Sequence, residues 1–207
     1  MRRCVIIGGA GIGRYDVIKT YLRDTDFMIC CDSGLNHADK LGIRPDLIIG
    51  DFDSHEKPDL PTETIILPCE KDDTDTMAAI REAAARGFRE FLLIGIIGGR
   101  LDHTLANIYI LLWLDHRGLK ASAVDDYSEL EIVSRSPAYV DDRYAYFSLV
   151  NISGKAEGVS ISNAKYTLEN AVIQSEFQLA VSNEPLPGKT AEITVKQGEL
   201  LLIKDRL

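Results

Sequence analysis

The sequence predicts two domains: an α/β domain with a parallel sheet over residues 1–126, followed by an all-β sandwich domain over residues 127–207. Two patterns lead to this fold class. In the first part of the chain, short and almost continuously apolar runs alternate with stretches of helical period, which is typical of a parallel sheet covered by helices. In the second part the helical period disappears, and short β-type runs follow one another between turn signals, which is typical of an antiparallel sandwich or roll.

The first domain is expected to contain six strands. Their apolar residues are nearly continuous rather than alternating with polar ones, as expected of strands that are covered on both faces. The strands are predicted at residues 4–7, 27–31, 47–49, 64–67, 91–97 and 121–124.

Two helices are expected between these strands. The first, over residues 74–86, begins with Asp and Thr residues that can cap its N-terminus, and it ends at Gly87. The second, over residues 101–117, ends at Gly118 and carries apolar residues at spacings of four, three and four. These apolar residues are Leu101, Leu105, Ile108 and Leu112.

The second domain is expected to contain short antiparallel strands. Turn signals such as Ser153-Gly154, Pro187-Gly188 and Gln197-Gly198 separate the β-type runs. The runs lie at residues 129–134, 144–150, 158–162, 171–174, 191–195 and 199–203.

Composition and charge exclude several classes of protein. The chain has 207 residues, enough for one large domain or two small ones, and its 45% hydrophobic and 27% charged residues exclude a disordered or fibrous protein. The 32 acidic residues outnumber the 23 basic ones, and the net charge of -9 argues against binding to nucleic acid or to an anionic membrane.

Targeting signals and cysteine usage indicate a cytoplasmic protein. No apolar run approaches the roughly 18 residues of a membrane span, and the N-terminal apolar run is too short for a secretory signal. The four cysteines form no CxxC pair and lie in or beside apolar runs. Buried, reduced thiols are therefore expected.

Acidic residues follow four of the predicted strands, at the point where each strand ends. Asp32 follows FMICC, Asp51 and Asp53 follow LIIG, and further acids follow TIILPCEK and FLLIGIIGG. Carboxyl ends of parallel strands meet at one edge, where ligands bind in open α/β sheets. So many negative charges in one crevice are costly unless a cation neutralises them.

The segment Gly50-Asp51-Phe52-Asp53-Ser54 is a candidate metal site. In extended backbone, residues i and i+2 point the same way, so Asp51 and Asp53 can direct both carboxylates at one point. Paired carboxylates suit Mg²⁺ bound together with a substrate phosphate. The alternative is a solvated turn in which Ser54 acts as a cap.

Two further segments allow both a functional and a structural interpretation. In residues 71–75, the acids either complete a metal site or simply cap the following helix and favour its dipole. In residues 98–103, a glycine pair leads into a helix, so that backbone N–H groups and Arg100 can bind phosphate and Asp102 can accept a proton. The alternative is a strand-to-helix turn with Asp102 as the N-cap.

The glycine-rich run at residues 8–13 is weak evidence for dinucleotide binding. The fingerprint needs a glycine at its sixth place, where counting from Gly9 puts Arg14; counting from Gly8 fails at Ala10. An NAD-dependent oxidoreductase is therefore disfavoured.

Three segments together resemble the thiamine pyrophosphokinase family. They are CDSGLNHADKLGIRPDLIIGDFDS at residues 31–54, KDDTD at 71–75 and GGRLDHTLAN at 98–107, in the family's order and spacing. In the second domain, residues 181–184 resemble the family's Ser-Asn segment. The resemblance runs through nearly the whole chain.

The resemblance implies a reaction, a domain organisation and a homodimer. The reaction is transfer of a pyrophosphoryl group from ATP to the hydroxyl of thiamine, which gives thiamine diphosphate and AMP. The first domain would bind ATP and Mg²⁺, the second would bind thiamine, and thiamine would lie at the subunit interface. The thiamine hydroxyl would attack the β-phosphorus, with either Asp102 or Asp75 accepting its proton.

The resemblance also implies a role for each motif residue. The metal ligands would be Asp51, Asp53 and Asp75. The nucleotide side would include Asp32, Asn36, Asp72 and Thr74, and Arg100 and Asp102 would lie beside the transferring phosphates. Ser182 and Asn183 would contact the thiamine pyrimidine. Some family members stack an aromatic residue on thiamine shortly after the Ser-Asn segment. Here that stretch reads EPLPGKT, and Trp113, the one tryptophan, lies on the predicted helix of the first domain.

Two alternatives share much of this sequence pattern. A pyrophosphokinase for another alcohol, such as a pterin, would keep the ATP and Mg²⁺ side and differ in the second domain. A nucleotide-binding module without turnover would keep the site without the chemistry, because a fold does not by itself imply catalysis.

Overall fold

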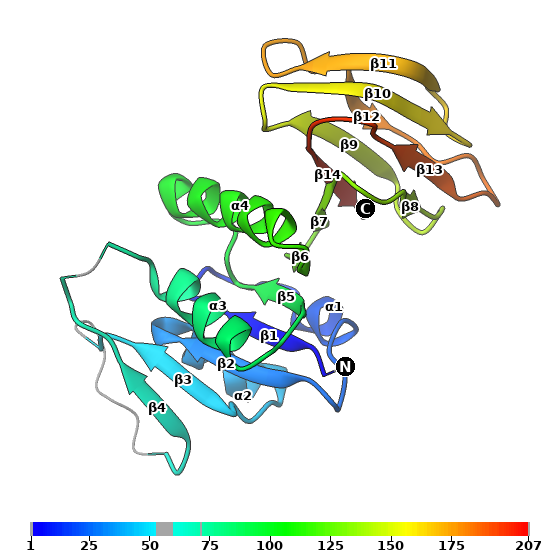
Figure 1. Cartoon of the computed structure of the whole chain (residues 1–207). Coiled ribbons are helices and arrows are strands. Elements are labelled where there is room, and N and C mark those ends of the chain that lie inside the picture. Colours follow the sequence, from blue (N-terminus) through cyan, green and yellow to red (C-terminus); the bar gives the residue numbers. More distant parts are fainter. Residues whose placement is uncertain (1, 53–59, 71, 207) are drawn as a thin grey trace. The chain divides into compact units, whose positions relative to one another are not determined.

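The computed structural model describes residues 2–52, 60–70 and 72–206. The chain forms two compact units, residues 1–126 and residues 127–207 (Figure 1).

The first unit is built on a six-stranded parallel sheet in the order β6-β5-β1-β2-β3-β4. Its strands are β1 (Cys4–Ile7), β2 (Phe27–Cys31), β3 (Leu47–Gly50), β4 (Glu63–Ile66), β5 (Glu90–Ile94) and β6 (Lys120–Val124). The predicted parallel sheet is confirmed. The strand predicted at residues 91–97 ends earlier, at Ile94, because Gly95 has a φ of +63° and turns the chain.

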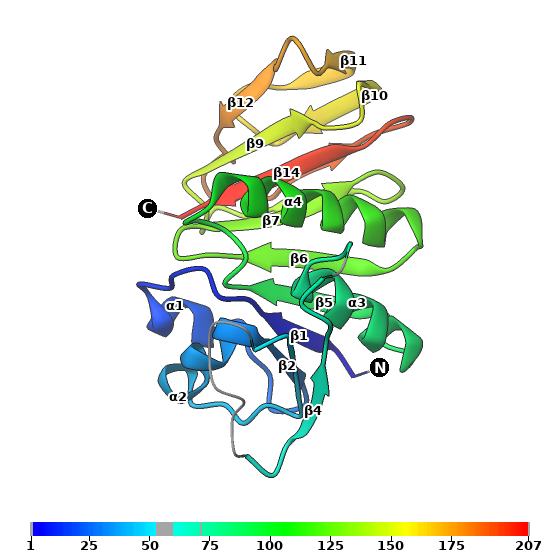
Figure 2. The ribbon, with the colours of Figure 1, turned by 90° about the vertical axis from the view of Figure 1, so that its left-hand side faces the viewer.

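Helices cover both faces of this sheet. They are α1 (Tyr15–Lys19), the 3₁₀ helix η1 (Asp32–His37), α2 (Ala38–Leu41), α3 (Asp75–Ala85) and α4 (Leu101–His116). One face of β1 and β2 packs against Ile18 of α1 and Leu41 of α2, and Figure 2 shows α3 on the other side of these strands. The two long helices occur where the sequence predicts them. The three short ones were not predicted, because a helix of one turn has no readable period.

The apolar stripe predicted on α4 does not face the core. Leu101 and Leu105 are 71% and 49% exposed. The buried residues of this helix are Asn107, Ile110, Leu111 and Leu114. Apolar residues occur on more than one side of α4, so that spacing alone marks a helix without deciding which side is covered.

The second unit is an antiparallel sandwich, as predicted. Its strands are β7 (Ser128–Val133), β8 (Ala138–Val140), β9 (Tyr146–Asn151), β10 (Lys155–Ser162), β11 (Leu168–Gln174), β12 (Ala180–Asn183), β13 (Ala191–Thr194) and β14 (Leu200–Asp205). Within the unit, β12-β9-β14-β7 and β11-β10-β13-β8 form the two layers. Phe147 and Leu202 from one layer pack against Val159 and Ile193 from the other, all fully buried.

The cysteine prediction is correct for three residues and wrong for the fourth. Cys4, Cys30 and Cys31 are buried free thiols, whereas Cys69 is an exposed one. Cys69 follows β4, which is the edge strand of the sheet, so the loop it occupies is not covered. Among the helices in the described part of the chain, none is long and apolar enough to span a membrane.

Candidate active site

All six strands of the first sheet end at one edge, and the loops that follow them are therefore neighbours. β1 pairs with both β2 and β5, and the chain continues outward from β1 in one direction through β2 to β4 and in the other through β5 and β6. Such a point of reversal is where open α/β sheets bind their ligands.

Asp32 and Asp51 are brought to this edge by adjacent strands. Gly50, the last residue of β3, packs so closely on Asp32 that a Cβ at residue 50 would lie 3.2 Å from the Asp32 Cα. Asp32 itself has a φ of +42°, a conformation that costs a non-glycine residue about 1–3 kcal/mol. Its Oδ1 is buried and has no hydrogen-bond partner among the described residues. Strain and an unsatisfied buried oxygen together are features of a binding site.

Asp75 approaches the same place from α3. The Sγ of Cys31 lies 3.7 Å from the Asp75 carbonyl oxygen, to which it can donate. Burial raises the pKa of Cys31 well above its ordinary value, and nearby acidic groups, including Asp75 and Asp32, raise it further. Both carboxylates therefore lie within electrostatic range of one buried thiol.

The argument that Asp51 and Asp53 point the same way is not supported. Phe52 has a φ of +54°, so the backbone after Asp51 is not extended and strand alternation does not apply there. Asp53 and Ser54 lie outside the described residues. Within residues 2–52, 60–70 and 72–206, no group of three acidic, histidine or cysteine side chains forms a metal-binding cluster.

Other residues near the start of α3 have local structural roles. The Thr74 side chain caps the helix by accepting from the Met77 N–H at 3.2 Å, which confirms the predicted cap. Asp73 forms an ion pair with Arg81 at 3.1 Å. Asp72 is exposed, as is Asn36 on η1, so both side chains can be reached by a ligand.

Arg100 and Asp102 form an exposed two-pronged ion pair at the start of α4. Arg100 Nη2 and Nε donate to the Asp102 carboxylate at 2.6 and 3.1 Å. The N-cap of α4 is Arg100, so the alternative of Asp102 as the N-cap is wrong. Hydrogen bonds from Arg100 and from the His103 N–H lower the pKa of Asp102 to about 2. Asp102 is therefore ionised at neutral pH and binds a proton only weakly.

The predicted thiamine-side residues lie on β12 in the second unit, and one side chain is exposed while the other is buried. Ser182 is exposed, with a φ of +58°. Asn183 is only 2% exposed, and its carboxamide is used within the chain. Its oxygen accepts from the N–H groups of Tyr166 and Glu184 at 3.0 and 2.9 Å, and its nitrogen donates to the Tyr166 carbonyl at 2.7 Å. Asn183 thus holds the loop that carries Tyr166.

Tyr166 is a candidate that the sequence did not reveal. Its ring is 59% exposed, and the ammonium of Lys165 lies 5.6 Å from the ring centroid. An exposed aromatic ring beside the Ser-Asn segment is a surface on which a flat cation can stack. No local pattern links residue 166 to residue 183, because the contact depends on how the loop that carries Tyr166 packs against β12.

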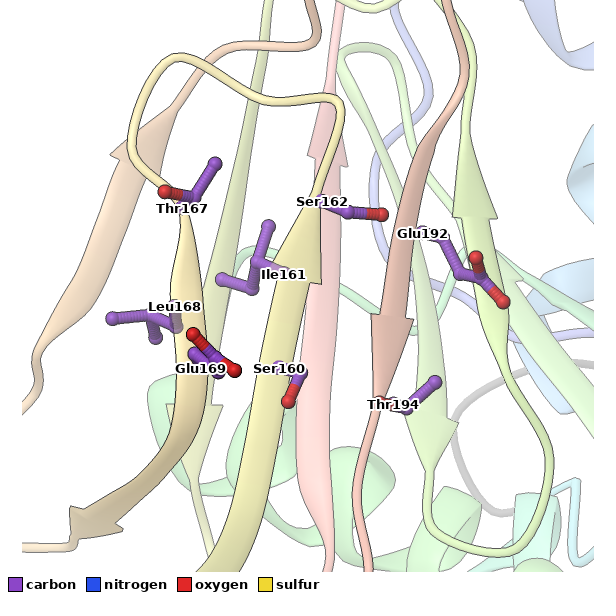
Figure 3. A pocket seen from close by; sticks show the side chains of 8 residues that line it. All are labelled: Ser160, Ile161, Ser162, Thr167, Leu168, Glu169, Glu192 and Thr194. Atoms are coloured by element: carbon purple, nitrogen blue, oxygen red, sulfur yellow. The ribbon is translucent and has the colours of Figure 1, made fainter.

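The second unit also has a shallow hollow of about 540 Å³ on the layer formed by β10, β11 and β13 (Figure 3). Hydroxyl groups of Ser160 and Thr194 and the carboxylates of Glu169 and Glu192 line it. None of the residues predicted from the sequence lies there.

Both units match models of one protein family. The model described as "Thiamin pyrophosphokinase, catalytic domain" matches residues 18–123, and "Thiamin pyrophosphokinase, vitamin B1 binding domain" matches residues 132–200. The chain is 24% identical over 212 residues to the thiamine pyrophosphokinase of Bacillus subtilis (strain 168), and the match covers 99% of each chain.

Solved structures share the fold. A crystal structure of the Bacillus subtilis thiamine pyrophosphokinase superposes with a TM-score of 0.88 at 24% identity, covering 100% of both chains. The Geobacillus thermodenitrificans thiamin pyrophosphokinase gives 0.84 at 27% identity, over 99% of this chain and 98% of the other. The yeast enzyme gives 0.79 at 16% identity, over 100% of this chain and 86% of the other.

Proposed function

The chain belongs to the thiamin pyrophosphokinase family and has that family's enzyme activity, and we propose that its reaction depends on Mg²⁺ held by Asp51, Asp53 and Asp75. The first unit would be the ATP-binding catalytic domain and the second the thiamine-binding domain. The observations that support the metal proposal are the close packing of Gly50, which precedes Asp51, on Asp32, and the contact of the Asp75 carbonyl with Cys31, which precedes Asp32.

The donor set fits the proposed metal. Carboxylate oxygens are hard ligands of the kind that Mg²⁺ prefers. A buried carboxylate oxygen without a partner, such as Oδ1 of Asp32, costs free energy that a bound cation or ligand donor would recover. When bound, Mg²⁺ neutralises charge on the phosphates of ATP and helps to orient them.

The chain's own residues would position ATP. Asp32 and Asn36 would face the nucleotide, with exposed Asp72 and the backbone around Thr74 nearby. Arg100 would bind the transferring phosphates through its planar guanidinium, and the paired carboxylate of Asp102 would orient it. Of the two acids considered as proton acceptors, Asp102 is poorly suited to this role, because a base with a pKa of about 2 takes up a proton poorly at neutral pH.

Thiamine would bind to the second unit beside Ser182. The hydroxyl of Ser182 is accessible, whereas Asn183 would act by holding Tyr166 in place. The Tyr166 ring would supply the aromatic surface that the stretch EPLPGKT lacks. A positively charged thiazolium is attracted to the face of such a ring.

A homodimer and a cytoplasmic location complete the proposal. Leu101, Leu105 and Tyr109 are exposed at successive turns of α4, and an apolar stripe of this kind is suited to contact between subunits. Light scattering coupled to size-exclusion chromatography would give the mass of a dimer, and the mass of a monomer at all concentrations would contradict it. Free thiols at all four cysteines are consistent with the reducing cytoplasm.

The reaction can be tested directly by ³¹P NMR of the protein with ATP, thiamine and Mg²⁺. We expect resonances of AMP and of a diphosphate ester, and we expect both to disappear when EDTA removes the metal. ADP with a monophosphate ester would contradict pyrophosphoryl transfer. Turnover with a pterin alcohol in place of thiamine would contradict the assigned acceptor.

A further inference from the structure

The glycine loop, residues 8–14, follows β1 and has no role in the proposed function so far. Its backbone is held at several points. The Gly8 and Ala10 N–H groups donate to the carbonyl oxygens of Ile94 and Gly95, each at 2.8 Å. At its far end, the Gly13 and Arg14 N–H groups donate to the two oxygens of the Asp126 carboxylate at 2.8 and 2.9 Å.

The glycine loop also lies directly against η1, the helix that carries Asp32 and Asn36. A Cβ at Gly9 would come within 1.9 Å of the Ser33 Oγ, and a Cβ at Gly34 would come within 2.1 Å of the Ile7 carbonyl oxygen. Glycine is therefore required at residue 34, where the contact is with backbone, and at residue 9 a larger residue would force the Ser33 side chain to move. This packing, rather than a dinucleotide fingerprint, accounts for the position of Gly9.

His37 joins these two segments through both of its ring nitrogens. It is the last residue of η1 and only 8% exposed. Its Nε2 lies 3.0 Å from the carbonyl oxygen of Ala10 in the glycine loop, and its Nδ1 lies 2.7 Å from the Tyr15 hydroxyl. A carbonyl only accepts, so Nε2 donates to it, and in a neutral ring Nδ1 then accepts from Tyr15. Burial lowers the pKa of His37, which agrees with a neutral ring.

We propose that His37 is a positioning residue for ATP binding: it ties the glycine loop to η1, and this connection holds Asp32 and Asn36 in place without itself contacting ATP. The inference rests on the proposed nucleotide side of the site. Tyr15 is part of the connection because its hydroxyl fixes which ring nitrogen carries the proton. The ring of Tyr15 is in turn covered by the ammonium of Lys40, 5.3 Å from its centroid.

Hydrogen–deuterium exchange of the ligand-free protein tests the connection itself. We expect His37→Leu to speed exchange in peptides that cover residues 8–14 and 32–37 by about tenfold, the effect of losing roughly one to two hydrogen bonds. Tyr15→Phe keeps the ring and removes only the hydroxyl, and we expect a smaller increase in the same peptides. His37→Gln retains a donor and an acceptor and should restore slow exchange. Tyr139→Phe, at an exposed tyrosine of β8, is the matched control and should change neither peptide.

Steady-state kinetics test the consequence for the nucleotide. We expect His37→Leu to raise the KM for ATP by about tenfold, and Tyr15→Phe by about threefold. For both variants we expect kcat and the KM for thiamine to stay within about twofold of the wild type. A lower kcat with an unchanged KM for ATP, or equal rises in both KM values, would mean a purely structural role and would overturn the proposal. So would unchanged exchange in both variants.

The two proposals fail in different ways. If the wild-type protein forms no AMP from ATP and thiamine, the proposed function is wrong, and the exchange data still decide whether His37 connects the two segments. Calorimetric titration with AMP then replaces kinetics as the measure of nucleotide affinity. Equal affinity in the wild type and in His37→Leu would overturn the positioning role.

Discussion

The two units each contain a cluster of acidic residues, but the clusters differ in how many of their carboxylate oxygens have hydrogen-bond or ion-pair partners. In the first unit, Asp32 is strained and has a buried oxygen without a hydrogen-bond partner among the described residues. In the second unit, the buried ammonium of Lys204 lies 2.5 Å from Glu129 and 2.9 Å from Glu131, and the Tyr144 hydroxyl donates to Glu129. Removing one partner from a fully paired buried cluster is destabilising, because a buried charge is left uncompensated, whereas a cluster left incomplete costs stability and suits a ligand site. The first cluster should therefore affect catalysis, and the second should affect folding.

The strongest test of this difference is removal of a proposed metal ligand. We expect Asp51→Asn to lower the rate of AMP formation by at least about 100-fold, because the neutral amide binds Mg²⁺ poorly. The midpoint of thermal unfolding should hardly change. Asp73→Asn is the matched control, since Asp73 forms an exposed ion pair with Arg81 and is not assigned to the metal. Near-normal turnover of both Asp51→Asn and Asp53→Asn at saturating Mg²⁺ would refute the metal assignment.

The opposite result is expected for the second cluster. Lys204→Met leaves Glu129 and Glu131 without their cation, and we expect it to lower the free energy of unfolding by about 3 kcal/mol. Urea titration measures this loss. The control is Lys155→Met, because Lys155 and Glu157 form a surface ion pair whose loss should cost less than about 1 kcal/mol. A loss from Lys204→Met no larger than that of the control would show that the buried network adds little stability.

A third prediction concerns the exposed ring of Tyr166 in the second unit. The buried and hydrogen-bonded carboxamide of Asn183 holds the loop that carries this ring. We expect Tyr166→Ala to raise the KM for thiamine by about tenfold without changing the KM for ATP, while Tyr166→Phe has little effect. Tyr139→Ala, at another exposed tyrosine of the same unit, should leave both KM values unchanged. An unchanged KM for thiamine in Tyr166→Ala would remove Tyr166 from the site.

A smaller effect is expected at alkaline pH. Burial alone lowers the pKa of Lys204, but Glu131 and Glu129 outweigh it, and the net pKa is raised. The stabilisation is therefore complete below the pKa of an unfolded lysine, about 10.4, and is lost as the pH rises through the folded value. Urea titrations at about pH 8 and about pH 11 should show the advantage of the wild type over Lys204→Met shrinking at the higher pH. A constant difference would mean that folding does not raise the pKa of Lys204.

Local patterns in the sequence predict the regular elements well and their surroundings poorly. The buried strands of the first sheet are visible as apolar runs, and Thr74 caps α3 as its position predicts. Phe52 and Cys69 contradict the expectations because a left-handed turn and an uncovered edge leave no mark in a run of residue types.

The order of strands, helices and motif residues follows from the sequence alone, because apolar period, capping residues and the family's motifs are properties of neighbouring residues. Tertiary structure decides which side of α4 is buried, that Asn183 holds Tyr166 rather than lying open, and that His37 reaches Ala10. Each of these depends on contacts between residues far apart in the chain. Such contacts are determined by how whole elements pack, and a local pattern carries no information about them.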